Sequence, residues 1–289
     1  MNPAAFLRHF GARTLLGSAL GLCVLCSGRE ARAYRPFDGT DADVADVGVF
    51  ELELGPAQFY RRGDANYVLA PSTVLNFGIA RDLELVVDFK QVIASRASQS
   101  EARVRWLDTD VLLKWLMRRG SLQDGQGLSV ALEAGPLVPE FRGEAGFGAQ
   151  ANLIVSARAR FGTLHFNEEA ALSRLGRVEL FSSIIAEGPE SLVVRPVAEL
   201  FVERELEARS TTYSALFGTI WSAAETLSVD GALRLASEER VRALEVRVGF
   251  TWAESLWSRS VAAPQNAHAS RRSLSAYSAP LSSPVGGRL

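Results

Sequence analysis

Residues 149–160 read AQANLIVSARAR, and this stretch decides the fold class because apolar and polar side chains alternate along it. One set is apolar and comprises Ala149, Ala151, Leu153, Val155, Ala157 and Ala159. The other set is polar and comprises Gln150, Asn152, Ser156, Arg158 and Arg160. A period of two places such sets on opposite faces of a β-strand. We therefore predict a strand here with one apolar face and one charged face.

The same alternation recurs in about twelve stretches between Val47 and Trp252, and a helical period of 3.6 never dominates a comparable window. At the end of this region, Val246 and Val248 lie on the opposite face from Arg247. Most stretches run about 10–14 residues, which suits a tilted strand crossing a bilayer. The sequence thus predicts an all-β fold, an antiparallel up-and-down transmembrane β-barrel of about twelve strands over residues 47–252.

Aromatic residues recur near the ends of these stretches, as expected for girdles at the two membrane interfaces. They are Tyr60, Tyr67, Phe77, Trp115, Phe147, Phe161, Tyr213, Trp221, Phe250 and Trp252. In the stretch around Asp108, the predicted lipid-facing set includes Leu107 and Val111. Pro71, Pro136 and Pro196 each remove a backbone donor within a stretch, which predicts a bulge or local break at each.

The polar faces carry charges of both signs, which a water-filled lumen accommodates. The expected lumen-lining residues are Glu51, Glu53, Glu84, Asp88, Lys90, Asp108, Asp110, Lys114, Glu133, Arg158, Arg160, His165, Glu169, Arg195, Glu199, Glu203, Asp230, Arg234, Glu245 and Arg247. The inverse arrangement, a soluble barrel with an apolar interior and these charges outside, stays open at this point.

The N-terminus has the features of a secretory signal. Arg8 and Arg13 precede an apolar run that is too short to span a bilayer, and residues 31–33 form an Ala-Arg-Ala cleavage site. We expect residues 1–33 to be a cleaved signal peptide and residues 34–46 a periplasmic lead-in. Both cysteines, Cys23 and Cys26, lie in this signal, so the mature chain would have no thiol for a disulfide or metal site. Residues 253–289 are rich in Ser, Ala, Pro and Arg without periodicity, which predicts a disordered tail.

Several segments resemble the family named for a putative "MetA-pathway of phenol degradation". The similar segments are Arg35–Asp41, Val47–Gly55, Leu69–Pro71, Asn76–Leu85, Asp108–Leu116, Val197–Leu200 and Val248–Trp252. The resemblance implies an outer-membrane barrel with a transport role, and it transfers no catalytic or binding residue. One departure is that residues 253–289 follow Trp252, whereas such barrels usually end on an aromatic residue.

Three functions remain as alternatives. The first is a channel or transporter for small solutes, including hydrophobic or aromatic ones as the family name implies; the second is a closed structural barrel. The third is a membrane lipid hydrolase in which Ser156 and His165 act together, although we expect no enzyme activity. Asp108 and Asp110 point the same way and suit calcium, but pairing with Arg158, Arg160 or Lys114 is the favoured use. We expect no cofactor.

The expected partners follow from this location. They are outer-membrane lipid, the barrel-assembly machinery and an unidentified small solute. A net charge of -2 without a basic cluster gives no basis for nucleic-acid binding.

Overall fold

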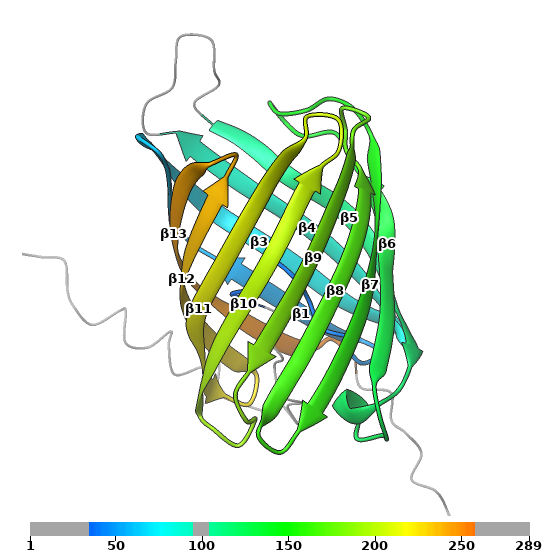
Figure 1. Ribbon diagram of the computed structural model, residues 1–289. Coiled ribbons are helices and arrows are strands. Elements are labelled where there is room, and N and C mark those ends of the chain that lie inside the picture. The colour runs from blue at the N-terminus through cyan, green and yellow to red at the C-terminus, as the bar shows by residue number, and fades with distance from the viewer. Residues whose placement is uncertain (1–34, 95–103, 258–289) are drawn as a thin grey trace, which may run out of the picture. The chain divides into compact units, whose positions relative to one another are not determined.

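The computed structural model describes residues 35–94 and 104–257, so the expected signal peptide and residues 258–289 of the expected tail lie outside the described residues. The described chain is almost entirely β-structure (Figure 1). Its strands are β1 (Val49–Gly55), β2 (Gln58–Arg62), β3 (Ala65–Ala80), β4 (Leu83–Ala94), β5 (Val104–Arg118), β6 (Ser129–Leu137), β7 (Gly148–Ala159), β8 (Gly162–Leu172), β9 (Val178–Glu187), β10 (Val194–Glu205), β11 (Ser210–Ala224), β12 (Leu227–Glu238) and β13 (Val241–Ser255). A short 3-10 helix covers Ser121–Gln123. In the ranges described, no helix combines the length and apolar character needed to cross a bilayer.

The strands form one closed antiparallel sheet in which each strand follows its sequence neighbour. β1 and β2 both lie between β13 and β3, β1 along one half of them and β2 along the other. The thirteen strands therefore occupy twelve positions around the barrel. Closure leaves no strand edge unpaired, which a bilayer interior requires. The predicted antiparallel barrel of about twelve strands is confirmed.

The joint between β1 and β2 contains one extra residue. Leu54 pairs with Phe250 and Phe59 pairs with Val246, so five steps along β1–β2 oppose four along β13. An extra residue makes a bulge, and it switches the inward-facing side chains from odd-numbered to even-numbered residues. The inward side chains accordingly change from Glu53 to Gln58.

A similar bulge lies in β5 and corrects one expectation. Lys90 pairs with Leu107 and Asp88 with Asp110, so β5 has one residue more than β4 in this interval. Asp108 adopts a positive φ of 49° at that point. The resulting change of parity turns Leu107 into the lumen, so the prediction that Leu107 faces lipid is wrong.

The three prolines behave differently from one another. The register of β3 against β4 shifts between Leu69 and Ser72, around Pro71, as predicted for a residue that cannot donate to the ladder. Pro136 and Pro196 lie in unshifted registers with β7 and β11. On its other side, the β5–β6 ladder has no pairs between Asp110–Leu137 and Leu113–Ala134, so the local break predicted at Pro136 is found there. The β9–β10 ladder begins only at Val197, directly after Pro196.

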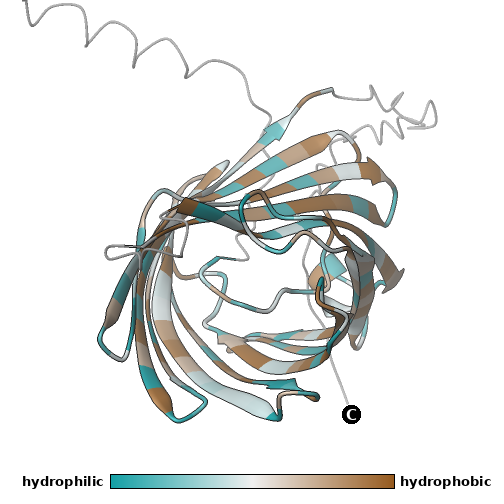
Figure 2. Cartoon of the chain, turned by 90° about the horizontal axis from the view of Figure 1, so that it is seen from above, coloured by the Kyte–Doolittle hydropathy of each residue, from teal (hydrophilic) through white to brown (hydrophobic). Residues whose placement is uncertain are grey.

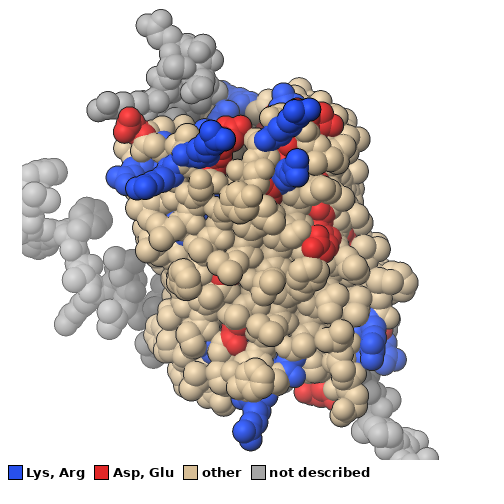
Figure 3. Space-filling model, in the orientation of Figure 1, with Lys and Arg blue, Asp and Glu red and all other residues tan. Residues whose placement is uncertain are grey.

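On the face that Figure 3 shows, charged side chains gather mainly toward the two ends of the barrel, and the band between them is largely uncharged. Leu200, Ile184 and Val248 are 59%, 55% and 51% exposed. Large apolar side chains at such exposure suit contact with hydrocarbon rather than water. Among the predicted girdle residues, Phe161 and Tyr213 are exposed, whereas Tyr60 and Tyr67 line the lumen.

Each end of the barrel carries both short and long connections. The end where β1 begins and β13 finishes has the two-residue turns after β3, β7 and β11, the connection through the 3-10 helix and segment 188–193. The opposite end has the two-residue turns after β2 and β12 and the segments 138–147 and 173–177. An even number of strand positions brings both ends of the barrel chain to one side. The last strand extends to Ser255, three residues past the predicted boundary.

Residues 35–48, which we name the inner segment, lie inside the barrel, where an irregular stretch of chain crosses the ring of strands in Figure 2. The expectation that residues 34–46 form a periplasmic lead-in is therefore wrong for the part that the structure describes. The physical reason is that lumen side chains satisfy the segment's backbone groups. A backbone without a sheet of its own needs such partners when it leaves bulk water.

Candidate functional site

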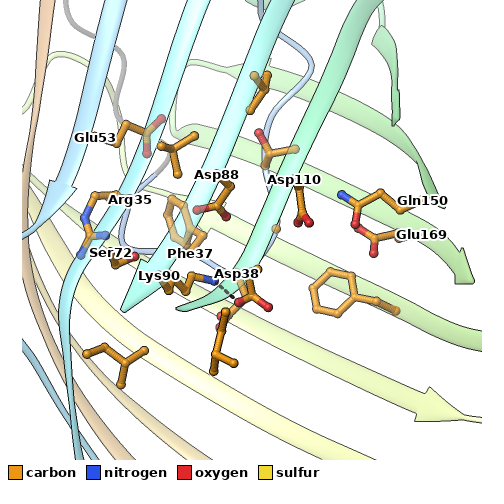
Figure 4. Close-up of a pocket in the computed structure, with 18 of the residues that line it drawn as sticks. Arg35, Phe37, Asp38, Glu53, Ser72, Asp88, Lys90, Asp110, Gln150 and Glu169 are labelled. Carbon is orange, nitrogen blue, oxygen red and sulfur yellow. Dashed lines mark hydrogen bonds and ion pairs between the residues drawn. The ribbon is translucent and has the colours of Figure 1, made fainter. Parts of the chain in front are cut away.

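The lumen contains a cavity of about 690 Å³ between the inner segment and the barrel wall. Its lining includes eleven carboxylate side chains and eight lysines or arginines, with apolar residues such as Leu69, Phe181 and Phe201 between them. Figure 4 shows Glu169 and Gln150 on one side of this cavity and Arg35 and Lys90 on the other. The barrel thus encloses a charged cavity rather than a packed apolar core.

The structure places thirteen of the expected lumen residues on the cavity wall. They are Glu53, Glu84, Asp88, Lys90, Asp108, Asp110, Lys114, Glu133, Glu169, Glu203, Arg234, Glu245 and Arg247. Five others are buried or nearly buried inside the barrel but lie outside this cavity: Glu51, His165, Arg195, Glu199 and Asp230. Arg158 lies inward near the end of β7 and pairs with Glu190 at 2.6 Å. Arg160 does not face the lumen, because β7 ends at Ala159 and Arg160 lies exposed in the following turn.

Glu199 of β10 and Asn167 of β8 bind the backbone of the inner segment. The Glu199 carboxylate accepts hydrogen bonds from the amides of Asp38 and Gly39, each at 2.8 Å. The Asn167 side chain accepts from the Thr40 amide at 3.1 Å and donates to the Thr40 carbonyl at 2.9 Å. A Cβ on Gly39 would lie 2.5 Å from the Ser183 Oγ and 3.0 Å from the Asn167 Nδ2, so a larger residue here would displace these side chains.

Arg247 of β13 fixes the start of the inner segment. Its guanidinium donates to the Pro36 carbonyl at 2.7 Å and to the Asp38 carboxylate at 2.8 Å, and it also pairs with Glu245. Burial raises the pKa of Asp38, but the guanidinium groups of Arg247 and Arg234 outweigh it and lower this pKa to about 2. Asp38 therefore stays ionised, and its ion pair persists, at any pH near neutrality.

Ser156, His165 and Glu187 form a chain of hydrogen bonds on β7, β8 and β9. Ser156 Oγ lies 2.8 Å from His165 Nδ1, and His165 Nε2 lies 3.1 Å from Glu187 Oε1. Ser156 and His165 meet because they lie directly opposite each other on the neighbouring strands β7 and β8. Ser156 is fully buried, and its Oγ also accepts a hydrogen bond from the Ala42 amide at 3.0 Å. In this arrangement the serine holds the inner segment.

Asp108 and Asp110 form ion pairs. Asp108 pairs with Lys90 at 3.0 Å and Asp110 with Arg174 at 2.7 Å, so pairing is observed but with partners other than those expected. Among the described residues, no group of three or more His, Cys, Asp or Glu side chains is arranged to hold a metal ion.

Sequence reasoning missed Arg174, which belongs to the connection between β8 and β9. Its guanidinium donates to the Val138 and Thr109 carbonyls at 2.7 and 2.8 Å and lies 3.5 Å from Glu140. No alternation exists in a loop, so no sequence signal marked this residue. Glu187 was also missed, although it continues the inward parity of β9 and alternation could have found it.

Comparison with known proteins bears on the fold. No family model and no curated protein sequence matches the chain. Among solved structures, the chain is similar to the COG4313 outer membrane channel from Pseudomonas putida F1, with a TM-score of 0.57 and 10% identity over 75% of this chain and 100% of that one. It is also similar to the KdgM porin, with a TM-score of 0.45 and 9% identity over 71% of this chain and 98% of that one. At such identities the likeness to the COG4313 channel shows a shared barrel fold and leaves activity to be argued from the lumen.

Proposed function

We propose that this protein is an outer-membrane channel for small solutes. The observation that carries the proposal is the charged, water-accessible cavity of about 690 Å³ inside a closed barrel with an apolar outer belt. A polar lumen behind a lipid-facing surface is the arrangement that lets solutes cross a membrane. The similar COG4313 structure is described as an outer membrane channel, which supports the same role.

The inner segment limits what can pass. It lies in the lumen toward the end where β1 begins and is held there by side chains from several strands, including Asn167 and Arg247. We infer a narrow pathway with small conductance while the segment is docked. A small acidic excess in the cavity favours cations among permeating ions.

Reconstitution into planar bilayers tests the channel. We expect small discrete current steps from the wild-type protein and larger steps after residues 35–46 are deleted. The matched control is the variant Glu168→Gln, since Glu168 lies on the outer face of β8 and bonds Ser182 there. Silence from both the wild-type protein and the deletion variant, at high protein load, would reject the channel in favour of a closed structural barrel.

A second candidate, a membrane lipid hydrolase, is favoured by the Ser156–His165–Glu187 chain alone. Against it, Ser156 is fully buried beneath Ala42. Hydrolysis of phospholipid that disappears in both Ser156→Ala and His165→Ala would establish this activity. If neither the wild-type protein nor the variant without residues 35–46 hydrolyses phospholipid, this activity is rejected.

The location and family remain predictions with their own tests. We propose export by a cleaved signal, insertion by the barrel-assembly machinery and contact with outer-membrane lipid. Heat-modifiable migration of the mature protein from outer-membrane fractions supports this, and recovery in soluble fractions without detergent contradicts it. No family-model match names the phenol-degradation family, so membership, with its hint of hydrophobic or aromatic solutes, stays a proposal.

A further inference from the structure

A single row of side chains crosses five neighbouring strands on the inner wall. In the strand register, Glu133 of β6 lies opposite Asn152 of β7, which lies opposite Glu169 of β8. Glu169 lies opposite Phe181 of β9, which lies opposite Glu203 of β10. All five side chains line the cavity. We name Glu133, Asn152, Glu169, Phe181 and Glu203 the acidic row.

The spacing within the acidic row separates its carboxylates. Adjacent strands lie about 4.8 Å apart, so carboxylates on alternate strands are about 10 Å apart. Glu169 and Glu203 therefore flank the ring of Phe181, which packs against Phe201 with centroids 5.2 Å apart. The result is a carboxylate on each side of an aromatic surface.

Two carboxylates of the acidic row form no ion pair among the residues that the structure describes, whereas Glu133 lies opposite Lys114 in the β5–β6 register. Neither Glu169 nor Glu203 forms an ion pair there, and Glu203 is exposed to the cavity. The cations across the cavity pair with other acids: Lys90 with Asp108, and Arg234 with Glu245. The Arg234 guanidinium also lies 4.9 Å from the centre of the Phe201 ring and acts electrostatically on Glu203, so the charge of Glu169 is the least compensated in the row.

Asn152 gives an independent indication of a missing donor. Its side chain is 3% exposed, and its Nδ2 donates to Asn167 Oδ1 at 3.1 Å. Its Oδ1 has no hydrogen-bond partner within residues 35–94 and 104–257, although it lies between Glu133 and Glu169 on the cavity wall. Buried acceptors are normally satisfied, so a donor supplied from the cavity fits this position.

We propose that the acidic row binds a small organic ammonium ion with an aromatic body, as the solute class of the channel; this rests on the proposed function. The ammonium lies at Glu169, between the Asn152 amide oxygen and the Phe181 ring, which are its neighbours in the row. The carboxylate attracts its charge, Asn152 Oδ1 accepts a hydrogen bond from it, the face of the Phe181 ring adds a cation–π interaction, and apolar residues of the cavity wall contact its body. An aromatic carboxylate of the same size meets like charge at this position.

Blocking of ionic current in planar bilayers tests the proposal, with 2-phenylethylammonium as the probe and 3-phenylpropanoate and tetramethylammonium as comparisons. We expect 2-phenylethylammonium to block at concentrations about 3–10-fold lower than either comparison ion. The double variant Glu169→Gln/Glu203→Gln and the single variant Phe181→Leu should each lose that preference. The matched control Glu168→Gln, one residue away on the outer face of β8, should keep it.

Each outcome is decisive. Equal block by the three probes, or an unchanged preference in both row variants, overturns the proposed binding while leaving the channel intact. If the wild-type protein passes no current, the channel proposal fails, and calorimetric titration of the detergent-solubilised barrel with the same three probes decides the binding. Heat-modifiable migration identifies any variant that fails to fold, and Phe181→Leu then serves in place of the double variant.

Discussion

Replacing Glu199 with Ala tests how firmly the lumen holds the inner segment. The Glu199 carboxylate is 1% exposed and accepts two amide hydrogen bonds at 2.8 Å, from Asp38 and Gly39. Hydrogen bonds to a charged group contribute roughly 1.5–3 kcal/mol each, so the pair contributes roughly 3–6 kcal/mol. Water entering the vacated space replaces about half of this. The ratio of released to docked segment should therefore rise by about 10–100-fold.

The rate of thiol labelling at position 42 measures this ratio. Ala42 is fully buried, so Ala42→Cys reacts with a charged reagent only when the segment leaves its site. The background chain carries Ser at positions 23 and 26, so that it has no other thiol. Glu199→Ala should accelerate labelling by about 10–100-fold, and Glu168→Ala, on the outer face, should not. Equal rates in the Glu199→Ala and unsubstituted backgrounds would refute the view that this carboxylate anchors the segment.

Three further predictions concern the barrel and its charges. Arg247→Met leaves Asp38 and Glu245 without their shared guanidinium and should destabilise the barrel by about 3 kcal/mol, seen as a lower midpoint of heat-modifiable migration; an unchanged midpoint contradicts this. Because the folded pKa of Asp38 is depressed to about 2, its contribution is present above pH about 4 and lost as pH falls through 2. The stability difference between the wild-type protein and Asp38→Asn should shrink over that interval, and a constant difference argues against the pairing. Val248→Arg in the outer belt should disfavour refolding into vesicles by about 2–4 kcal/mol, whereas Val241→Arg at the strand end should cost at most about 1 kcal/mol; similar effects would place the belt elsewhere.

The strand faces were accessible to sequence reasoning wherever the period of two was unbroken. Glu84, Glu199 and Glu245 point inward as alternation required, because side-chain direction in a strand depends only on parity. Alternation gave the wrong direction for side chains beyond a bulge. Leu107 precedes the extra residue at Asp108, and nothing in the local composition marks where a ladder gains a residue.

Loop and terminal residues of the site were beyond sequence reasoning. Arg174 reaches Asp110 and Glu140 from a connection without periodicity, so its position depends on how the loop folds back over the lumen. Arg35 and Asp38 belong to a polar stretch whose composition suits solvent equally well. Their place inside the barrel depends on partners more than a hundred residues away, such as Glu199.

Alternation and strand length by themselves determined that this chain closes into an antiparallel barrel, because backbone pairing and a two-sided strand pattern have few other solutions. The tertiary structure alone decided what the lumen contains. The inner segment enters it because Glu199, Asn167 and Arg247, on separate strands, converge on one backbone. The acidic row exists because registers across five strands align, and register is a property of pairing that no single strand encodes.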